Sequence, residues 1–109
     1  MLPAITKDAY LRELGFDQVS RYSCWDYPLL QGEPAFVPPS DVRYLHPQPA
    51  ADHTRLYAYA WVNEPGFLLA TERHISALNH IVAELETDDF VPLRLEVETF
   101  FRRHGGPAH

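Results

Sequence analysis

The side chains of this chain that are best suited to chemistry are its six histidines and its one cysteine. No two histidines are four residues apart, the spacing by which a helix turns two imidazoles toward one zinc ion. His80 and Glu84 have this spacing, but they fall on the polar side of the helix expected there, so we interpret them as a solvated pair. Glycine is scarce and forms no phosphate-binding loop. We therefore expect neither a metal ion nor a cofactor. The histidines are His46, His53, His74, His80, His104 and His109.

The position of His74 favours two different interpretations. In the helix expected over residues 71–86, it falls in the apolar arc with Leu78. The first interpretation is a hydrogen-bonded histidine at the edge of the core. The second is a general base in a pocket between sheet and helix, with Tyr57 or Tyr59 donating a hydrogen bond to a substrate. The second interpretation makes the chain a small α+β enzyme or ligand-binding domain.

The single cysteine lies in the sequence Ser23-Cys24-Trp25, which resembles the Ser-Cys-Trp around the nucleophile of papain-type cysteine proteases. The resemblance covers these three residues and leaves out the glycine and cysteine that precede them in that signature. A cysteine nucleophile also needs a base and an orienting group close by, and nothing in the sequence links His46 or His74 to Cys24. We expect Cys24 to be a small buried side chain of a strand.

Length and composition limit the class of protein. The 109 residues predict a single domain, residues 1–109, that can bury a core of its own. The net charge is −6, from 15 acids against 9 bases, which argues against direct binding to nucleic acid. The lone cysteine favours a reducing compartment. No stretch is long and apolar enough to cross a membrane, and the N-terminal residues lack the pattern of a signal peptide. We expect a cytoplasmic protein.

Residues 54–62 carry the clearest pattern in the chain, because two kinds of side chain alternate there without interruption. A period of two predicts a β-strand. The turn sequence Asn-Glu-Pro-Gly follows at residues 63–66, and residues 67–70 are expected to return antiparallel to the first strand. The two faces of the strand are Leu56, Ala58, Ala60 and Val62 on one side, and Tyr57, Tyr59 and Trp61 on the other.

A short helix is expected over residues 6–14. Thr6 is a suitable N-cap, and Gly15 can take the left-handed conformation that ends many helices. In that arrangement Phe16 packs back on Leu11, which is the usual hydrophobic contact of a glycine-ended helix.

A strand and a long loop are expected next. Residues 19–27 are rich in β-branched and aromatic side chains and predict a strand. Six of the ten prolines follow between Pro28 and Pro49. Because proline resists both helix and central strand, residues 28–53 are expected to form a surface loop, with one short edge strand at residues 42–46.

Two helices are expected in the C-terminal part. Residues 91–104 fit both a strand and a helix, but Asp89 in the capping position and Pro92 in the first turn favour the helix. This helix is expected to pair with the preceding one across residues 87–89. The preceding helix, residues 71–86, is predicted from the helical spacing of Ile75, Leu78, Ile81, Val82 and Leu85.

These elements predict an α+β fold, in which a small, mainly antiparallel sheet carries helices on one face and the chain ends in a helical pair. Ala58 and Ala60 are small enough to let a helix approach closely. We therefore expect their face to lie under the helix of residues 71–86, with the three aromatic rings of the strand on the opposite face.

The aromatic face and a group of acids at residues 84–98 leave two interpretations open. Either the rings are covered by the proline-rich loop or the first helix and the acids are simply solvated, or both form a docking surface. The second interpretation gives our main hypothesis. It is a non-catalytic protein-binding module, such as a small acidic inhibitor, an immunity-type protein or an accessory protein, that docks on a protein partner or forms a homodimer. The predicted binding residues are Tyr57, Tyr59, Trp61, Glu84, Glu86, Asp88, Asp89, Glu96 and Glu98.

Overall fold

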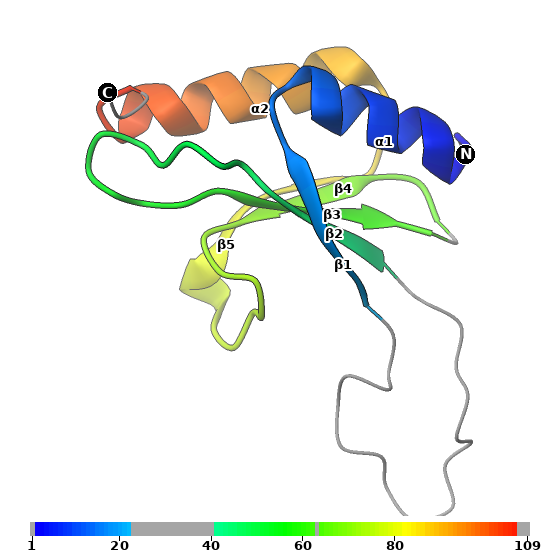
Figure 1. Ribbon diagram of the computed structural model, residues 1–109, viewed down its shortest axis with the longest axis horizontal. Coiled ribbons are helices and arrows are strands. Elements are labelled where there is room, and N and C mark those ends of the chain that lie inside the picture. The colour runs from blue at the N-terminus through cyan, green and yellow to red at the C-terminus, as the bar shows by residue number, and fades with distance from the viewer. Residues whose placement is uncertain (1, 23–40, 63, 107–109) are drawn as a thin grey trace, which may run out of the picture.

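A five-stranded antiparallel sheet with two helices on one face forms the molecule (Figure 1). The computed structural model describes residues 2–22, 41–62 and 64–106. The strands follow one another in the sheet in chain order, so each connection joins neighbouring strands. The α+β class predicted from the sequence is confirmed. The elements are α1 (Ala4–Glu13), β1 (Asp17–Tyr22), β2 (Asp41–Leu45), β3 (Tyr57–Trp61), β4 (Phe67–Ala70), the 3-10 turn η2 (Leu78–His80), β5 (Ile81–Leu85) and α2 (Phe90–Arg103).

The end of α1 has the geometry expected of a glycine-terminated helix. Gly15 has a φ of 96°. Its N–H donates to the carbonyl of Arg12, and the N–H of Phe16 donates to the carbonyl of Leu11, both at 3.0 Å. This pair of hydrogen bonds is the Schellman motif. It turns the chain so that Phe16 packs beside Leu11 in the core, as predicted.

The beginnings of the two helices differ from each other. α1 begins at Ala4, so Thr6 lies inside the helix and the prediction that it is the N-cap is wrong. In α2, Asp89 does occupy the N-cap position, although its side chain makes no capping hydrogen bond. Pro92 lies in the first turn, where its missing N–H costs nothing. The helical alternative for residues 91–104 is confirmed.

β2 is an interior strand of the sheet, second in the strand order. It pairs with β1 on one edge and with β3 on the other, so the prediction of an edge strand at residues 42–46 is wrong. Because β2 has a strand on each side, its first four residues are buried and only Leu45 is partly exposed. The strand predicted at residues 19–27 is observed as β1, whose residues end at Tyr22. The rest of that prediction, and the first part of the proline-rich loop, lie outside the described residues.

The helix predicted over residues 71–86 does not form, and this is the main correction to the sequence analysis. β5 stands in its place, preceded by the turn η2, and Leu78 of the expected apolar arc is 87% exposed. Residues 81–85 contain β-branched side chains that fit a strand as well as a helix. Pairing with β4 decides between them, because β4 is buried throughout and would otherwise leave an unpaired apolar edge. The expected helical pair across residues 87–89 is therefore wrong, since a strand leads into α2.

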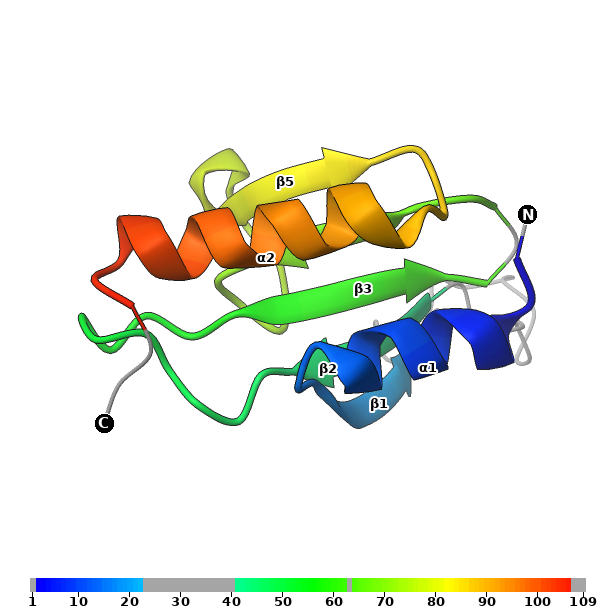
Figure 2. The same cartoon turned by 90° about the horizontal axis from the view of Figure 1, so that it is seen from above.

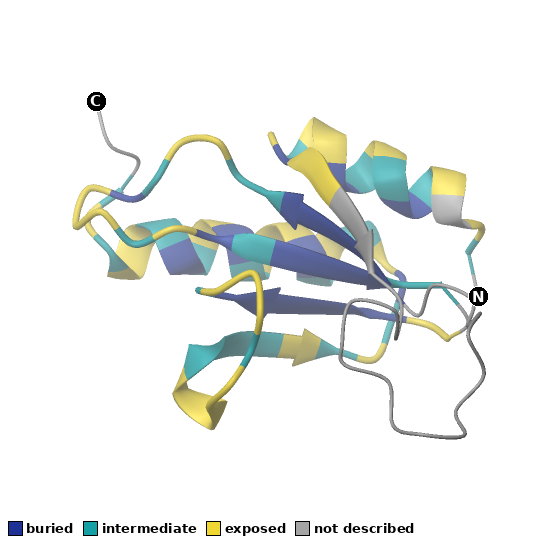
Figure 3. Ribbon diagram, turned by 60° about the horizontal axis from the view of Figure 1, so that its bottom comes forward, coloured by how far each residue is buried: buried dark blue, intermediate teal, exposed yellow. Residues whose placement is uncertain are grey.

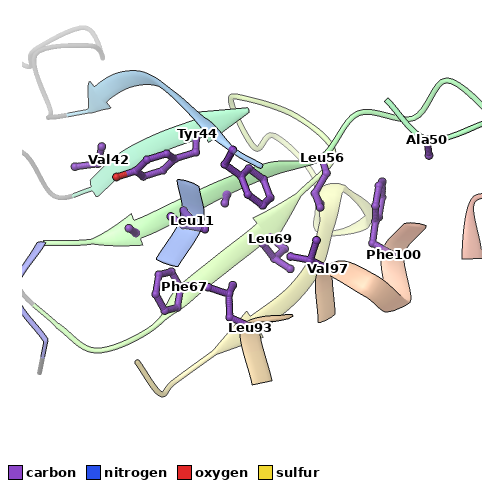
Figure 4. Close-up of a cluster of buried hydrophobic side chains, with 13 residues drawn as sticks. Leu11, Val42, Tyr44, Ala50, Leu56, Phe67, Leu69, Leu93, Val97 and Phe100 are labelled. Carbon is purple, nitrogen blue, oxygen red and sulfur yellow. The ribbon is translucent and has the colours of Figure 1, made fainter. Parts of the chain in front are cut away.

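The main core lies between the sheet and the two helices, which stand above the sheet in Figure 1 and lie in front of it in Figure 2. Ala58 and Ala60 are almost fully buried there. The small side chains admit α1 and α2 rather than a helix of residues 71–86. Figure 4 shows the cluster. Its buried members are Leu11, Phe16, Val42, Tyr44, Ala50, Leu56, Ala58, Ala60, Phe67, Leu69, Leu93, Val97 and Phe100.

A buried lysine joins α1 to the turn between β3 and β4. Lys7 is 1% exposed, and its ammonium lies 3.0 Å from the carboxylate of Asp88. It also donates to the backbone carbonyls of Trp61 and Glu64, each at 3.0 Å. A buried ammonium is tolerated when its charge is paired and its three protons have acceptors, and both conditions are met.

The carboxylate of Asp88 completes this junction from the other side. It accepts hydrogen bonds from the N–H of Gly66 at 2.8 Å and from the N–H of Leu2 at 2.7 Å. Burial raises the pKa of Asp88, but the hydrogen bonds from Gly66, Leu2 and Lys7 outweigh burial, and the net pKa is lowered. Gly66 has a φ of 110°, and a Cβ there would lie 2.0 Å from the carbonyl oxygen of Leu85. The junction therefore requires glycine at this position.

We expect Lys7→Met to lower the free energy of unfolding by about 3 to 5 kcal/mol, because it leaves the Asp88 carboxylate buried without its partner. Urea denaturation of the purified chain measures this. Arg12→Met is the matched control, since Arg12 forms an exposed pair with Asp8 on the same helix, at 2.8 Å. The control should lose about 0.5 kcal/mol or less. Equal losses in the two variants would contradict the role given to Lys7.

Candidate functional site

The sheet face opposite the helices, turned toward the viewer in Figure 3, carries a second, smaller core. The connection between β4 and β5 lies on this side of the sheet, below it in Figure 1. Three residues of the face are buried, and four apolar side chains pack partly buried against them. The face is therefore partly covered by the chain itself. The buried residues are Tyr59, Leu68 and Ala70, and the partly buried ones are Tyr57, Trp61, Ile75 and Ile81.

Tyr59 belongs to the interior of this face. Its ring is 3% exposed and lies under the guanidinium of Arg43, 4.3 Å from the ring centroid. Arg43 is itself buried and paired with Asp41 at 3.0 Å. The hydroxyl of Tyr59 donates to the backbone carbonyls of Glu72 and Arg73. The prediction that Tyr59 is available to a partner is therefore wrong, because the connection after β4 and the side chain of Arg43 cover it.

The other two rings of β3 are half-buried and lie at opposite ends of the strand. Tyr57 lines a cleft of about 410 Å³ together with His53 and Arg55. Trp61 lines a different cleft, and its ring centroid lies 6.3 Å from that of Tyr59. The buried Tyr59 thus divides the aromatic face, and each remaining ring has its own surroundings.

The cleft at Trp61 brings predicted aromatic and acidic binding residues together. It measures about 380 Å³. Glu84 enters it because β5 pairs with β4 in the register Leu68–Glu84, which places Glu84 on the same sheet face as Trp61. Glu86 follows two residues later. We call this hollow the acidic cleft, and it is lined by Trp61, Glu64, Pro65, Phe67, Glu84, Leu85 and Glu86.

The remaining predicted acids lie elsewhere. Asp88 is buried in its pair with Lys7, and Asp89 lies at the beginning of α2. Glu98 pairs with Arg94 on α2, at 3.7 Å. Of the six predicted acids, only Glu84 and Glu86 line the same cleft as Trp61. Glu96, like Glu98, lies on α2.

Glu64 and Pro65 complete the acidic cleft, and the sequence analysis missed both. They belong to the turn between β3 and β4, for which the sequence predicts turn geometry and no binding role. The available signal was proximity in sequence, because a turn that directly follows Trp61 must lie at the end of the strand that carries it. Glu64, in that turn, lines the same cleft as Trp61.

His74 does not lie where the enzymatic interpretation needs it. The helix that was to carry it is absent, and His74 is exposed on the connection between β4 and β5. Its Nδ1 lies 3.1 Å from Nη1 of Arg43. Among the described residues, no group of three histidine, cysteine or acidic side chains is arranged to hold a metal ion. Cys24 lies outside the described residues.

A larger hollow lies on the helix side, between the ends of α1 and α2 and the connection from β2 to β3. It measures about 550 Å³, and Leu14, Val97 and Phe101 form part of its wall. His46 lies among these groups, with its ring centroid 5.3 Å from that of Phe16 and 4.8 Å from that of Phe101. The lining residues include both acids, Glu13 and Glu98, and a base, Arg102. This mixed charge favours neither an anionic nor a cationic ligand.

A clasp beside this hollow ties the end of α2 to the connection between β2 and β3. Nδ1 of His104 lies 2.6 Å from the carboxylate of Asp52. The N–H of Ala51 donates to the carbonyl of Gly106 at 2.7 Å. The hydrogen bond from His104 lowers the pKa of Asp52 to about 2, and hydrogen bonds from Thr54 act in the same direction.

No family model, curated protein or solved structure matches this chain. The structure shows a small α+β fold with an acidic cleft at one corner of its sheet. Within the described part of the chain, no helix has the length and apolar character needed to cross a bilayer.

The different positions of Tyr59 and Trp61 predict different effects of truncation. We expect Tyr59→Ala to cost about 3 kcal/mol of unfolding free energy, because it opens a cavity and uncovers a buried arginine. Trp61→Ala should cost about 1 kcal/mol, since its ring is half-exposed. Chemical denaturation compares the two variants. A larger loss from Trp61→Ala than from Tyr59→Ala would contradict the division of this face into core and surface.

The clasp predicts a pH dependence of stability. The pKa of Asp52 is lowered from 3.8 to about 2 in the folded chain, so its contribution is present above pH 3.8 and is lost as the pH falls toward 2. In Asp52→Asn, stability should therefore fall less steeply over this range than in the wild type. Urea titrations at several pH values measure the slopes, with Asp89→Asn as the control. Parallel curves for the wild type and Asp52→Asn would refute the assignment.

Proposed function

We propose that this chain is a non-catalytic protein-binding module that docks, in the cytoplasm, on a basic segment of a protein partner. One observation carries the proposal. Trp61 and three acidic residues, Glu64, Glu84 and Glu86, line a single cleft. The single cysteine of the chain supports a reducing compartment.

The chemistry of the acidic cleft suits an arginine or lysine side chain. Carboxylates accept the donors of a guanidinium or an ammonium, and an indole face attracts a cation within about 6 Å of the ring centroid. Trp61 supplies such a ring, and Glu84 of β5 and Glu86, which follows the strand, line the same cleft. A partner that places a basic residue here gains charge pairing and apolar contact at one point.

The net charge of −6 supports the same proposal. A protein with this excess of acid attracts basic surfaces over distances of several ångströms, which speeds association with them. A small acidic inhibitor or an immunity-type protein that covers a basic site on its target needs this property. A homodimer through the acidic cleft is disfavoured, since it brings like charges together.

The enzymatic alternative receives less support from the same residues. His74 is exposed, and the hydroxyl of Tyr59 donates to backbone carbonyls. Tyr57 lines a cleft with His53 and Arg55 at the other end of β3. Tyr59 and His74 both contact Arg43, but the hydroxyl that the enzymatic alternative assigns to a substrate is already donated to the backbone.

Charge reversal tests the acidic cleft. We expect the double variant Glu84→Lys, Glu86→Lys to lose binding of a peptide of about nine residues that alternates arginine with valine or threonine, by about tenfold or more. Isothermal titration calorimetry measures the affinity at low and at physiological salt. Glu13→Lys, Glu98→Lys is the matched control, because these acids line the hollow on the helix side and the change in net charge is the same.

The control variant should retain most of the affinity. Equal weakening of both double variants would show that net charge alone attracts the peptide, and would overturn the role of the acidic cleft. If Trp61→Ala binds the peptide as tightly as the wild type, the indole does not contribute to binding.

A further inference from the structure

β5 is the last strand of the sheet, and its outer edge has no neighbouring strand among those described. Its partner is β4, so half of its backbone N–H and C=O groups point away from the sheet. Figure 2 shows β5 in the outermost position, beside α2. Its sequence, Ile-Val-Ala-Glu-Leu, contains neither lysine nor proline, which commonly protect an edge from pairing. Such an edge is a template for an extended peptide.

A register shift protects only the beginning of β5. Leu69 pairs with Ala83 and Ala70 pairs with Ile81, so Val82 has no partner on β4. A bulge of this kind interrupts the strand pairing locally. Residues 83–85 pair with β4 without interruption. The open part of the edge is therefore its C-terminal half, which ends at the acidic cleft.

Two hollows flank this edge. The acidic cleft lies at the C-terminal end of β5, and a hollow of about 220 Å³ lies between the start of β5 and α2, with Val82 and Phe100 in its lining. Successive side chains of a strand point to opposite faces. A strand laid along β5 would turn one set of side chains toward α2 and the other set toward Glu84 and Glu86.

We propose that the basic segment of the partner binds as an extended strand along the free edge of β5, as a sixth strand of the sheet. This inference rests on the proposed function, because it concerns the shape of the segment that enters the acidic cleft. Hydrogen bonds to the backbone of β5 supply affinity, and side chains at alternate positions supply specificity. The bound segment therefore alternates arginine or lysine, which face the carboxylates, with small or β-branched residues, which face α2.

Charge selects a basic partner over a second copy of this chain. Glu64, Glu84 and Glu86 lie at the C-terminal end of β5. Pairing two copies edge to edge would bring these carboxylates close to those of the other copy, and like charges across a strand pair are destabilising. A basic strand neutralises them instead.

Three versions of the alternating peptide used above test the strand geometry. One is unmodified, the second is N-methylated at its arginines, and the third is N-methylated at the intervening residues. Each pattern removes the N–H donors along one edge of an extended peptide and leaves the other edge intact. We expect one methylated peptide to bind the full chain about tenfold more weakly, and the other to bind like the unmodified peptide. Amide hydrogen exchange of residues 81–85 should slow when the unmodified peptide binds.

The possible failures are distinguishable. Similar affinities for all three peptides, or equal weakening by both methylation patterns, would overturn strand addition. The proposed function would stand in that case, because the peptide would still bind through its charge. No binding of the unmodified peptide would overturn both proposals. A chain that is dimeric by light scattering, with slow exchange at β5 before any peptide is added, would assign the edge to a second copy and overturn the choice of occupant.

Discussion

The buried ion pair of Lys7 and Asp88 is the interaction on which the rest of the structure depends. A charge removed from water is stable only when every partner is in place. Lys7 therefore requires the carbonyls of the β3–β4 turn, and Asp88 requires the N–H of Gly66 and that of Leu2. These groups come from opposite ends of the chain and from its middle. The same contacts hold the walls of the acidic cleft, since Lys7 binds the backbone of residues 61 and 64. The cleft is thus formed before a ligand arrives, which lowers the cost of binding.

Local patterns predicted most of the elements, and the exception shows where local reasoning ends. β3 follows from strict alternation, the end of α1 from Gly15, and α2 from its terminal signals. The apolar residues between Ile75 and Leu85 satisfy a helical spacing, yet residues 81–85 also suit a strand. The choice depends on β4, whose buried apolar residues need a partner on their outer edge. That requirement lies outside the segment, so no pattern within it reveals the outcome.

The candidate site was predicted in part for the same reason. Trp61, Glu84 and Glu86 were named from their types, but their meeting depends on the register between β4 and β5, which a predicted helix cannot supply. The sequence leaves open whether Tyr59 is covered or belongs to a docking surface, because nothing in it shows that Arg43 lies over the ring. Both points depend on contacts between strands, which form only in the folded chain.

Mapping of a bound peptide on the folded chain tests the central claim most directly. Nuclear magnetic resonance spectra of the labelled protein, recorded while the unmodified arginine-containing peptide is added, locate every residue whose surroundings change. We expect the largest shifts at the indole N–H of Trp61 and at the amides of residues 83–86, with residues around His46 unaffected. Shifts centred on the hollow between the two helices, with none at Trp61, would contradict the assignment of the acidic cleft as the binding site.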